Sequence, residues 1–434
     1  MVYRLKSSDN GFISELKKAT CRKNVADAIH VNKVAEIIAN IKNRGDDALI
    51  EYTAKLDNEG VKPLSLELSQ EEIRAAATNC KTPILEALKS AAVRIENFHK
   101  KQAPQPDLDY IDDSGTRLGM RWAPLQSVGI YVPGGTAAYP SSVLMNAIPA
   151  KIAGVKRISM VVPTPNGYLN PDVMAAAEIA GINEIYRIGG AQAIAALTYG
   201  TETILPIDKI VGPGNKWVAE AKRQVFGDVG IDMVAGPSEI LIVADNLNNC
   251  DWIAADLLSQ AEHDKEAQSI LITDDSNFAN EVSNAVDKRL NTLPRRDIAY
   301  SSWHNNGLII IVKTLDESPK LINLIAPEHL ELAISNPEDL FRNVLHAGSV
   351  FLGRYTPEAI GDYVAGPNHV LPTSNSARFS SGLAVYDFLK RTTFTECNAI
   401  SLSKLAPTAI TIAKAEGLTA HAISMQLRTK GDIN

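Results

Sequence analysis

The sequence lacks the patterns that mark secreted, membrane-spanning and nucleic-acid-binding chains. Its opening segment, MVYRLKSSDNGF, has no apolar core of the length that a secretory signal needs. No uncharged apolar stretch reaches about 18 residues, the length that would span a membrane. The net charge is −7 and no basic run of five or more residues occurs, so no positive surface for nucleic acid is expected. We therefore expect a cytoplasmic protein without nucleic-acid or membrane partners.

Cysteine is scarce and scattered. The four cysteines, Cys21, Cys80, Cys250 and Cys397, are far apart and form no CxxC pair. This spacing indicates free thiols in a reducing compartment rather than a disulfide framework or a thiolate metal site. A catalytic cysteine would point to an aldehyde-oxidising thiol enzyme, but none of the four lies beside a glycine-rich or histidine-rich segment.

Two hydrophobic patterns divide the 434 residues, which exceed the usual size of one domain. Residues 1–110 carry apolar residues at helical spacing, with a break near Gly45 and an N-cap at Ser69. From about residue 126, short apolar runs alternate with helical stretches, which is typical of parallel sheets covered by helices. We predict an α/β fold of two lobes with incomplete Rossmann-like parallel sheets flanked by helices, plus helical N- and C-terminal extensions.

Domain boundaries follow from the same patterns. Pro237 follows a Met-Val-Ala-Gly segment and suits a return point between lobes. Residues 364–382 are rich in Gly, Pro, Ser and Asn and suit a loop. The predicted pieces are a helical extension at 1–25, an α/β lobe made of 26–126 plus 237–381, a second lobe at 127–236, and a helical tail at 382–434.

Three strand-to-helix junctions within 127–236 carry glycines. They are Tyr131 before Gly134-Gly135, Gly189-Gly190 before Gln192, and Gly212-Pro213-Gly214 before Asn215. Glycine lets the backbone approach a ligand, and free N–H groups of a helix N-terminus attract an anion. The third glycine of the dinucleotide fingerprint is missing after Gly214. A nucleotide crevice and an ordinary tight turn, with Asn215 simply capping the helix, both remain open.

Two segments offer possible metal ligands. Gln260 and His263 are three residues apart in a helical stretch, so both lie on one face and could reach one cation. A solvated polar face at a helix end is the alternative. Asp362 stands between Gly361 and Tyr363 in a glycine-containing loop, where it is either a ligand or simply a turn residue.

Two further segments join a glutamate with a histidine. Glu328 and His329 are adjacent in an apolar run and can share acid–base chemistry near neutral pH, or serve only as a cap and a structural histidine. Glu416 and His421 flank a glycine in the C-terminal segment, where a surface role is the alternative. His369 is structural or near the site. Because HExxH, zinc-finger spacing and GxSxG are all missing, spacing alone predicts a scattered site and names no reaction.

Taken together, these segments resemble the histidinol dehydrogenase family. The likeness runs from about residue 25 to 430 and includes, in order, SVGIYVPGG, IGGAQAIAAL, KIVGPGN, AGPSEILIVAD, AGSVFLG, GDYVAGPNHVLPT and EGLTAHAISMQLR. The resemblance implies oxidation of L-histidinol to L-histidine, the last step of histidine biosynthesis, through a bound aldehyde and with two NAD reduced in turn. It also implies a homodimer in which the tail at 382–434 is exchanged.

The resemblance further assigns roles to individual residues. It implies that His329 is the general base and that Glu328 activates the water that adds to the aldehyde. The implied zinc ligands are Gln260, His263, Asp362 and His421, the last from the partner subunit. The implied substrate contacts are Ser238, Gln260, His263, His329, Asp362, Glu416 and His421. The implied NAD contacts are Tyr131, Gln192 and Asn215, which makes 127–236 the NAD-binding lobe and leaves much of the zinc and substrate site to the other lobe.

Two other kinds of protein fit parts of these patterns. A non-catalytic zinc- or nucleotide-binding relative would be expected to lose a proton-transfer residue, whereas Glu328 and His329 are both present. A dehydrogenase of a different amino alcohol would keep the zinc ligands and change substrate contacts such as Glu416, which is also present.

Overall fold

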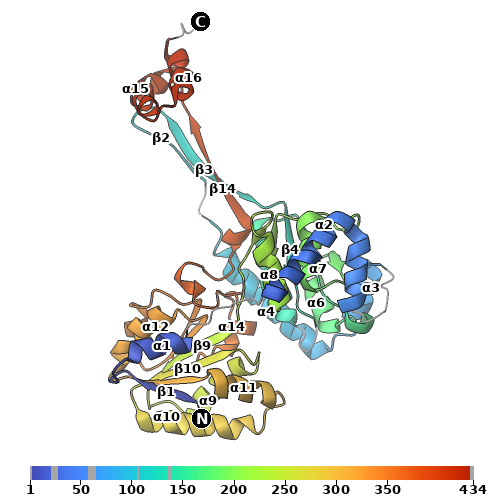
Figure 1. Cartoon of the computed structure of the whole chain (residues 1–434), viewed down its shortest axis with the longest axis vertical. Helices are drawn as coiled ribbons and strands as arrows, with labels where there is room; N and C mark the ends of the chain where they lie inside the picture. The colour runs from blue at the N-terminus through green and yellow to red at the C-terminus, as the bar shows by residue number, and fades with distance from the viewer. Residues whose placement is uncertain (1, 21–27, 57–64, 105–106, 135–138, 431–434) are drawn as a thin grey trace.

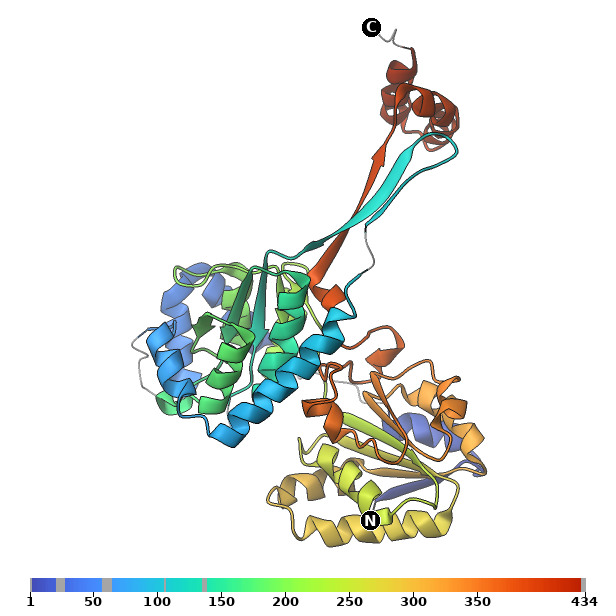
Figure 2. The ribbon, with the colours of Figure 1, turned by 180° about the vertical axis from the view of Figure 1, so that it is seen from behind.

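The computed structural model describes residues 2–20, 28–56, 65–104, 107–134 and 139–430. These residues form two α/β lobes and a long arm that extends away from both of them and carries the C-terminus (Figure 1). Figure 2 shows the same arrangement from behind. The predicted α/β fold, with parallel sheets flanked by helices, is confirmed. No helix among the described residues is long and apolar enough to cross a membrane.

The first lobe contains a five-stranded, fully parallel sheet in the order β6-β5-β4-β7-β8. Its strands are β4 (Ser127–Tyr131), β5 (Arg157–Val161), β6 (Glu184–Tyr186), β7 (Lys209–Val211) and β8 (Gly230–Ile231). The strand order reverses direction between β4 and β7, and in open α/β sheets the carboxyl ends of the strands at such a switch point are where ligands bind. Tyr131 ends β4 and Gly212 follows β7, so two of the predicted glycine junctions meet at this switch point.

Seven helices described in this lobe cover both faces of that sheet. They are α2 (Ala28–Leu56), α3 (Gln70–Ala77), α4 (Thr82–Lys100), α5 (Pro140–Ala153), α6 (Pro171–Ala180), α7 (Gly190–Tyr199) and α8 (Lys216–Val225). One core joins α2, α7 and α8, and the other joins α3, α4, α5 and α6. The grouping of 26–126 with 237–381 is therefore wrong for these helices. An amphipathic helix shows that one face must be buried, but its pattern does not say against which sheet.

The second lobe contains a six-stranded parallel sheet in the order β1-β11-β10-β9-β12-β13. Its strands are β1 (Tyr3–Lys6), β9 (Glu239–Ala244), β10 (Gln268–Thr273), β11 (Leu308–Ile311), β12 (His329–Ala333) and β13 (Ser349–Leu352). Its helices are α1 (Phe12–Thr20), α9 (Cys250–Ala261), α10 (Ser276–Leu290), α11 (Arg296–Asn306), α12 (Ser318–Ile325), α13 (Pro337–Phe341) and α14 (Ala359–Tyr363). All residues of β9 and β10 are buried, as expected of central parallel strands.

The N-terminal segment corrects the prediction of a helical extension at 1–25. Tyr3–Lys6 forms the edge strand β1, which pairs with β11 in parallel, and α1 packs its apolar residues onto the same lobe. A four-residue edge strand has too few alternating positions to be recognised from its own sequence. Its pairing partner lies about three hundred positions later.

The arm is built from an antiparallel sheet and a helical tip. Its elements are β2 (Leu108–Ile111), β3 (Arg117–Pro124), β14 (Leu389–Glu396), α15 (Ala399–Ala415) and α16 (Thr419–Lys430). Every residue of β14 pairs with β3, so the segment at 382–434 contains a strand and is not wholly helical as predicted. Short 3-10 turns complete the described secondary structure, at Pro165–Gly167, Leu315–Glu317, Ser376–Arg378 and Val385–Phe388.

Candidate active site

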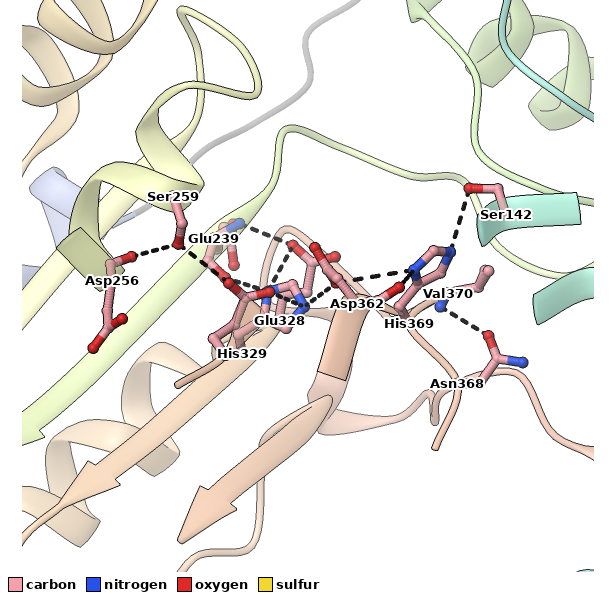
Figure 3. A network of polar contacts seen from close by, with 11 residues as sticks. Ser142, Glu239, Asp256, Ser259, Glu328, His329, Asp362, Asn368, His369 and Val370 are labelled. Carbon is pink, nitrogen blue, oxygen red and sulfur yellow. Dashed lines mark hydrogen bonds and ion pairs between the residues drawn. The ribbon is translucent and has the colours of Figure 1, made fainter. Parts of the chain in front are cut away.

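A buried polar cluster lies where the second lobe meets the first (Figure 3). Glu239 begins β9 and His329 begins the neighbouring parallel strand β12, so the cluster lies at the amino ends of these strands. Ser142, on α5 of the first lobe, reaches His369 across the boundary, with 3.3 Å between its Oγ and the ring Nε2. Side chains of both lobes thus contribute to the same network.

His329 presents one ring nitrogen to the site and uses the other to fix the ring. Its Nδ1 donates to the Glu239 carbonyl oxygen at 3.1 Å, which leaves the neutral ring with its lone pair on Nε2. That Nε2 is buried without a hydrogen-bond partner, 3.5 Å from Glu358 Oε1 and 3.9 Å from Asp362 Oδ1. Burial lowers the pKa of His329 to about 4. The ring is therefore neutral near pH 7 and can accept a proton at Nε2.

Glu328 lies behind the same ring. Its Oε2 accepts a hydrogen bond from the Glu239 backbone N–H at 2.9 Å and is 3.8 Å from His329 Nδ1. Burial raises the pKa of Glu328 well above its usual value, and the neighbouring carboxylates of Glu239, Asp362 and Glu358 add to the rise. A carboxylate with such a raised pKa is a stronger base than a solvated one.

The donor atoms around His329 suit a divalent cation. One atom each from His329, Glu358 and Asp362 lie within 4.8 Å of one another. Gln260, in the last turn of α9, is 1% exposed, and its Oε1 has no hydrogen-bond partner. His263 follows α9 and is close enough to His329 to lower the pKa of that ring further. Buried oxygens without hydrogen bonds are costly unless something else satisfies them, and a cation would do so.

Three of the residues in this cluster were not predicted from the sequence. Glu358 faces His329, and burial together with the Asp362 carboxylate raises the pKa of Glu358 to about 8. The backbone of Glu239 holds both Glu328 and His329, and Ser142 reaches in from the other lobe. Only Glu358 left a signal in the sequence, since it precedes Asp362 by four residues and so lies on the same face of a helical turn.

His369, predicted as structural or near the site, holds the end of α14. Asp362 lies in this short helix and not in a loop as expected. The His369 Nδ1 donates to the Asp362 carbonyl oxygen at 2.8 Å. Because its other nitrogen reaches Ser142, His369 connects α14 to α5. Ser238, another predicted contact, is half-buried directly before β9 and so lies beside Glu239.

Two predicted site residues lie elsewhere in this chain. Glu416 ends α15 and His421 belongs to α16, and both side chains are exposed. These helices form the tip of the arm, away from both lobes (Figure 1). A single chain therefore does not bring Glu416 or His421 to His329.

The glycine loops of the first lobe form a second feature. Tyr131 is buried, and its hydroxyl accepts a hydrogen bond from the Gly190 N–H at 3.1 Å. Gln192 is buried in the first turn of α7. Asn215 caps α8, accepting from the N–H groups of Trp217 and Val218 at 3.0 and 3.2 Å. Two helix N-termini thus open onto the β4–β7 switch point, an arrangement that suits the phosphates of a dinucleotide.

Parallel sheets flanked by helices, two helix N-termini at the switch point of one lobe, and a buried histidine beside carboxylates in the other are together typical of the α/β dehydrogenase class. A family model described as histidinol dehydrogenase matches residues 20–429. The chain is 57% identical over 427 residues to "Histidinol dehydrogenase 1" of Nostoc sp., with 98% of each chain covered. It is 59% identical over 396 residues to the histidinol dehydrogenase of Rhodospirillum rubrum, with 91% of each covered.

A crystal structure of histidinol dehydrogenase from Elizabethkingia anophelis superposes with a TM-score of 0.93 at 38% identity, covering 99% of this chain and 98% of that one. The chain belongs to the histidinol dehydrogenase family. Membership makes it an NAD-dependent oxidoreductase of histidine biosynthesis and confirms the resemblance seen in the sequence.

Proposed function

We propose that this protein oxidises L-histidinol to L-histidine at the cluster around His329, as the last step of histidine biosynthesis. The reaction passes through bound L-histidinal in two oxidations, each of which gives one hydride to NAD. The observation that carries the proposal is the buried His329 ring, whose Nε2 is free of hydrogen bonds and lies 3.5 Å from Glu358 and 3.9 Å from Asp362.

His329 is the base of both oxidations in this proposal. Its Nε2 takes the hydroxyl proton of histidinol while the hydride leaves the carbinol carbon, and the carbinol becomes an aldehyde. The Glu239 carbonyl, which accepts from Nδ1, keeps the ring oriented and stabilises the positive charge that forms on it. After that proton has left, the same Nε2 takes a proton from the hydrated aldehyde as the second hydride departs.

Glu328 acts between the two oxidations. Its carboxylate takes a proton from the water as the water oxygen adds to the aldehyde carbon, and the protonated His329 Nε2 returns its proton to the former carbonyl oxygen, which gives the hydrate that is oxidised next. The Glu239 N–H holds this carboxylate beside His329, so the two bases share one backbone residue. The raised pKa of Glu328 supports this role because it increases the strength of the base.

We infer that the cation ligands are those of a zinc site. Gln260, His263 and Asp362 from one chain, together with His421 of the partner subunit, would hold the ion. The unpartnered Gln260 Oε1 and the place of Asp362 in a group of possible metal ligands support a cation site, and the proposed set of two histidine nitrogens and two oxygens suits zinc. When bound, zinc would orient the imidazole and amine of the substrate and offset the negative charge of the crowded carboxylates.

We assign NAD to the first lobe, at 127–236. The proposed contacts are Tyr131, Gln192 and Asn215, all at the carboxyl edge of the sheet. The tethering of the Tyr131 hydroxyl to Gly190, and the helix N-termini beside it, support this placement.

We further propose a homodimer with shared sites. Ser238, Gln260, His263, His329 and Asp362 of one chain would contact the substrate together with Glu416 and His421 of the other. Two features of the arm support this dimer. The arm extends away from its own lobes (Figure 1). Several of its exposed side chains are large and apolar, namely Ile111, Ile400, Ile412 and Leu427. Such surfaces are expected to be covered by another chain.

A cytoplasmic location agrees with the thiols. Cys80, Cys250 and Cys397, the described cysteines, are all free, as expected in a reducing compartment. Cys21 lies outside the described residues.

An NADH-release assay with L-histidinol and NAD, before and after chelation, tests the function. We expect two NADH for each histidine formed, loss of turnover on chelation, and recovery on adding zinc. One NADH with release of the free aldehyde would contradict the reaction, and turnover unaffected by chelation would contradict the zinc. A variant with all four cysteines changed to serine is the matched control, and it should keep its turnover.

A further inference from the structure

A buried ion pair holds the Gly212 peptide from both sides. Asp232 Oδ2 accepts the Gly212 N–H at 2.8 Å, and Lys222 Nζ donates to the Gly212 carbonyl oxygen at 2.6 Å. Lys222 and Asp232 also contact each other, with 2.6 Å between Nζ and Oδ1. The Met233 N–H donates to that same Oδ1 at 2.6 Å. Both polar groups of one residue are therefore fixed by two charged side chains.

The pair is withdrawn from water. The side chains of Lys222 and Asp232 are only 3% and 1% exposed. Removing two charges from water costs several kcal/mol per ion, and an apolar pair of similar volume is often at least as stabilising. Stabilisation of the fold is therefore a weak explanation for the presence of this ion pair. Its hydrogen bonds, in contrast, hold one particular stretch of backbone in position.

Gly212 lies against the neighbouring strand with no room for a side chain. Its φ is +106°, and a Cβ at this position would lie 2.2 Å from the Tyr131 carbonyl oxygen. The Tyr131 side chain in turn reaches Gly190 at the start of α7. If the Gly212 backbone shifted, it would press against the Tyr131 backbone. It would also displace the N-terminus of α8, which begins four residues later.

We propose that Lys222 and Asp232 are positioning residues for the dinucleotide. They hold the Gly212 backbone so that the loop before α8 and the Tyr131 backbone are in place before NAD arrives. Neither residue needs to touch NAD, because the effect passes through Gly212. A preformed loop avoids the entropic cost of ordering on binding. The inference rests on the proposed NAD site at Tyr131, Gln192 and Asn215.

The test is the double variant Lys222→Met/Asp232→Leu in the full-length enzyme, which leaves no unpaired buried charge. We expect the KM for NAD to rise by about 10-fold, because hydrogen bonds of charged groups that order the loop are lost. The KM for histidinol should stay near that of the wild type, whereas the melting temperature should fall somewhat because the buried Gly212 N–H and carbonyl lose their partners. Hydrogen exchange in the peptide covering residues 209–216 should become faster, since the Gly212 amide loses its acceptor.

The matched control is Arg157→Met. It removes the ion pair with Glu184 at the amino ends of β5 and β6, the edge of the same sheet opposite the proposed NAD site. This variant should leave the KM for NAD unchanged. If the double variant does not fold, Asp232→Asn replaces it, because asparagine keeps the shape of the side chain. The same rise in the KM for NAD is then expected.

Tyr131→Phe separates failure of this inference from failure of the proposed NAD site. An unchanged KM for NAD in the folded Lys222→Met/Asp232→Leu variant, with a raised KM in Tyr131→Phe, would overturn the positioning role alone. An unchanged KM for NAD in both would overturn the cofactor site and the inference with it. A rise in both, with faster exchange at 209–216, supports both.

Discussion

At the scale of the residue, one hydrogen bond decides the chemistry of His329. Because Nδ1 donates to the Glu239 carbonyl, the proton-accepting nitrogen is Nε2, which faces Glu358 and Asp362. The ring is buried and neutral, so it is ready to accept a proton before substrate binds. The neighbours that the backbone places around the ring thus set the protonation state that the proposed reaction needs.

Replacing His329 by alanine should reduce turnover by about 10²–10⁴-fold, the usual contribution of a positioned base. Zinc should remain bound, since the proposed ligands are Gln260, His263 and Asp362 with His421 of the partner subunit. The measurements are the rate of NADH formation and the metal content of the purified variant. His304→Ala, on α11, is the control and should keep its turnover. Turnover like that of the wild type in His329→Ala would reject the assignment.

Glu328→Gln should separate the two oxidations. The amide keeps an oxygen to accept from the Glu239 N–H, so the fold around it is preserved, but it cannot take a proton from water. In a single-turnover experiment we expect a first hydride transfer close to that of the wild type and a second slowed by about 100-fold. Equal slowing of both steps would argue against a water-activating role.

Asp256 on α9 gives a prediction for stability against pH. Burial raises the pKa of Asp256 from 3.8 to about 6. Below about pH 4 this carboxyl is protonated in both states. Between pH 4 and 6 it ionises first in the unfolded state, so folding loses stability as the pH rises, and above about pH 6 the loss is complete.

Asp256→Asn removes this pH-dependent loss of folding stability, because the asparagine side chain does not ionise. Above pH 6 the variant should melt higher than the wild type by about 3 °C, and the difference should shrink as the pH falls to 4. Thermal melts of the metal-free protein across this pH range provide the measurement. Asp274→Asn, at an exposed position, should leave the pH profile as it is. A constant difference between pH 4 and 7 would show that ionisation of Asp256 is not the cause.

At the scale of the element, the ends of two helices carry the cation ligands that we propose. The last turn of α9 carries Gln260, with His263 just beyond it, and α14 presents Asp362 one turn after Glu358. The ends of both helices point to the amino edge of β9 and β12, where His329 begins its strand (Figure 3). In the proposed site, the positions of the donors thus depend on where two helices end and a strand begins.

Gln260→Leu should weaken zinc binding by at least about 10-fold, since losing even an outer-shell partner costs 10–100-fold. The side chain keeps a similar volume in its buried place, so the metal-free fold should be retained. Competition with a chromogenic chelator measures the affinity. Glu262→Gln, in the same turn but outside the proposed set, is the control. Unchanged affinity in Gln260→Leu would remove this residue from the proposed site.

At the scale of the whole molecule, the arm separates the chain into a body and a tip that serve different sites in the proposed dimer. The tip holds Glu416 and His421, while the body holds His329. If sites are shared, a lesion in one subunit's tip inactivates the site of the other subunit's body. Mixing two inactive variants then becomes informative.

Co-expression of His329→Ala with His421→Ala should restore about a quarter of the wild-type activity. Mixed dimers form about half of the population, and each has one site with both lesions and one intact site. Either variant alone should be nearly inactive. No recovery, with mixed dimers demonstrated by two different affinity tags, would contradict tail exchange.

Several elements were predictable because their signals are local. The break near Gly45 is present, where φ is +51°, and Ser69 forms a capping box with Glu72. The alternation of strands and helices after residue 126 correctly predicted two parallel sheets. Each of these features depends on residues only a few positions apart, so a short stretch of the sequence is enough to predict it.

Other features depended on partners that no such stretch contains. The strand β1 forms by pairing with β11, and β14 forms by pairing with β3. The apolar faces of α2, α3 and α4 are buried in the first lobe. Hydrophobic burial is non-directional, so the pattern of a helix says that it must be covered but not by what. This is why the predicted grouping of 26–126 with 237–381 was wrong for α2, α3 and α4 although most of the elements were right.

The sequence by itself determined the alternation of strands and helices, the family, and which residue types are available for catalysis. Only the tertiary structure decided that Glu358 faces His329, that Glu239 fixes the ring, and that Glu416 and His421 lie out of reach of their own body. The physical reason is distance along the chain. These contacts join segments whose meeting depends on the packing of whole sheets and lobes, and no local propensity encodes it.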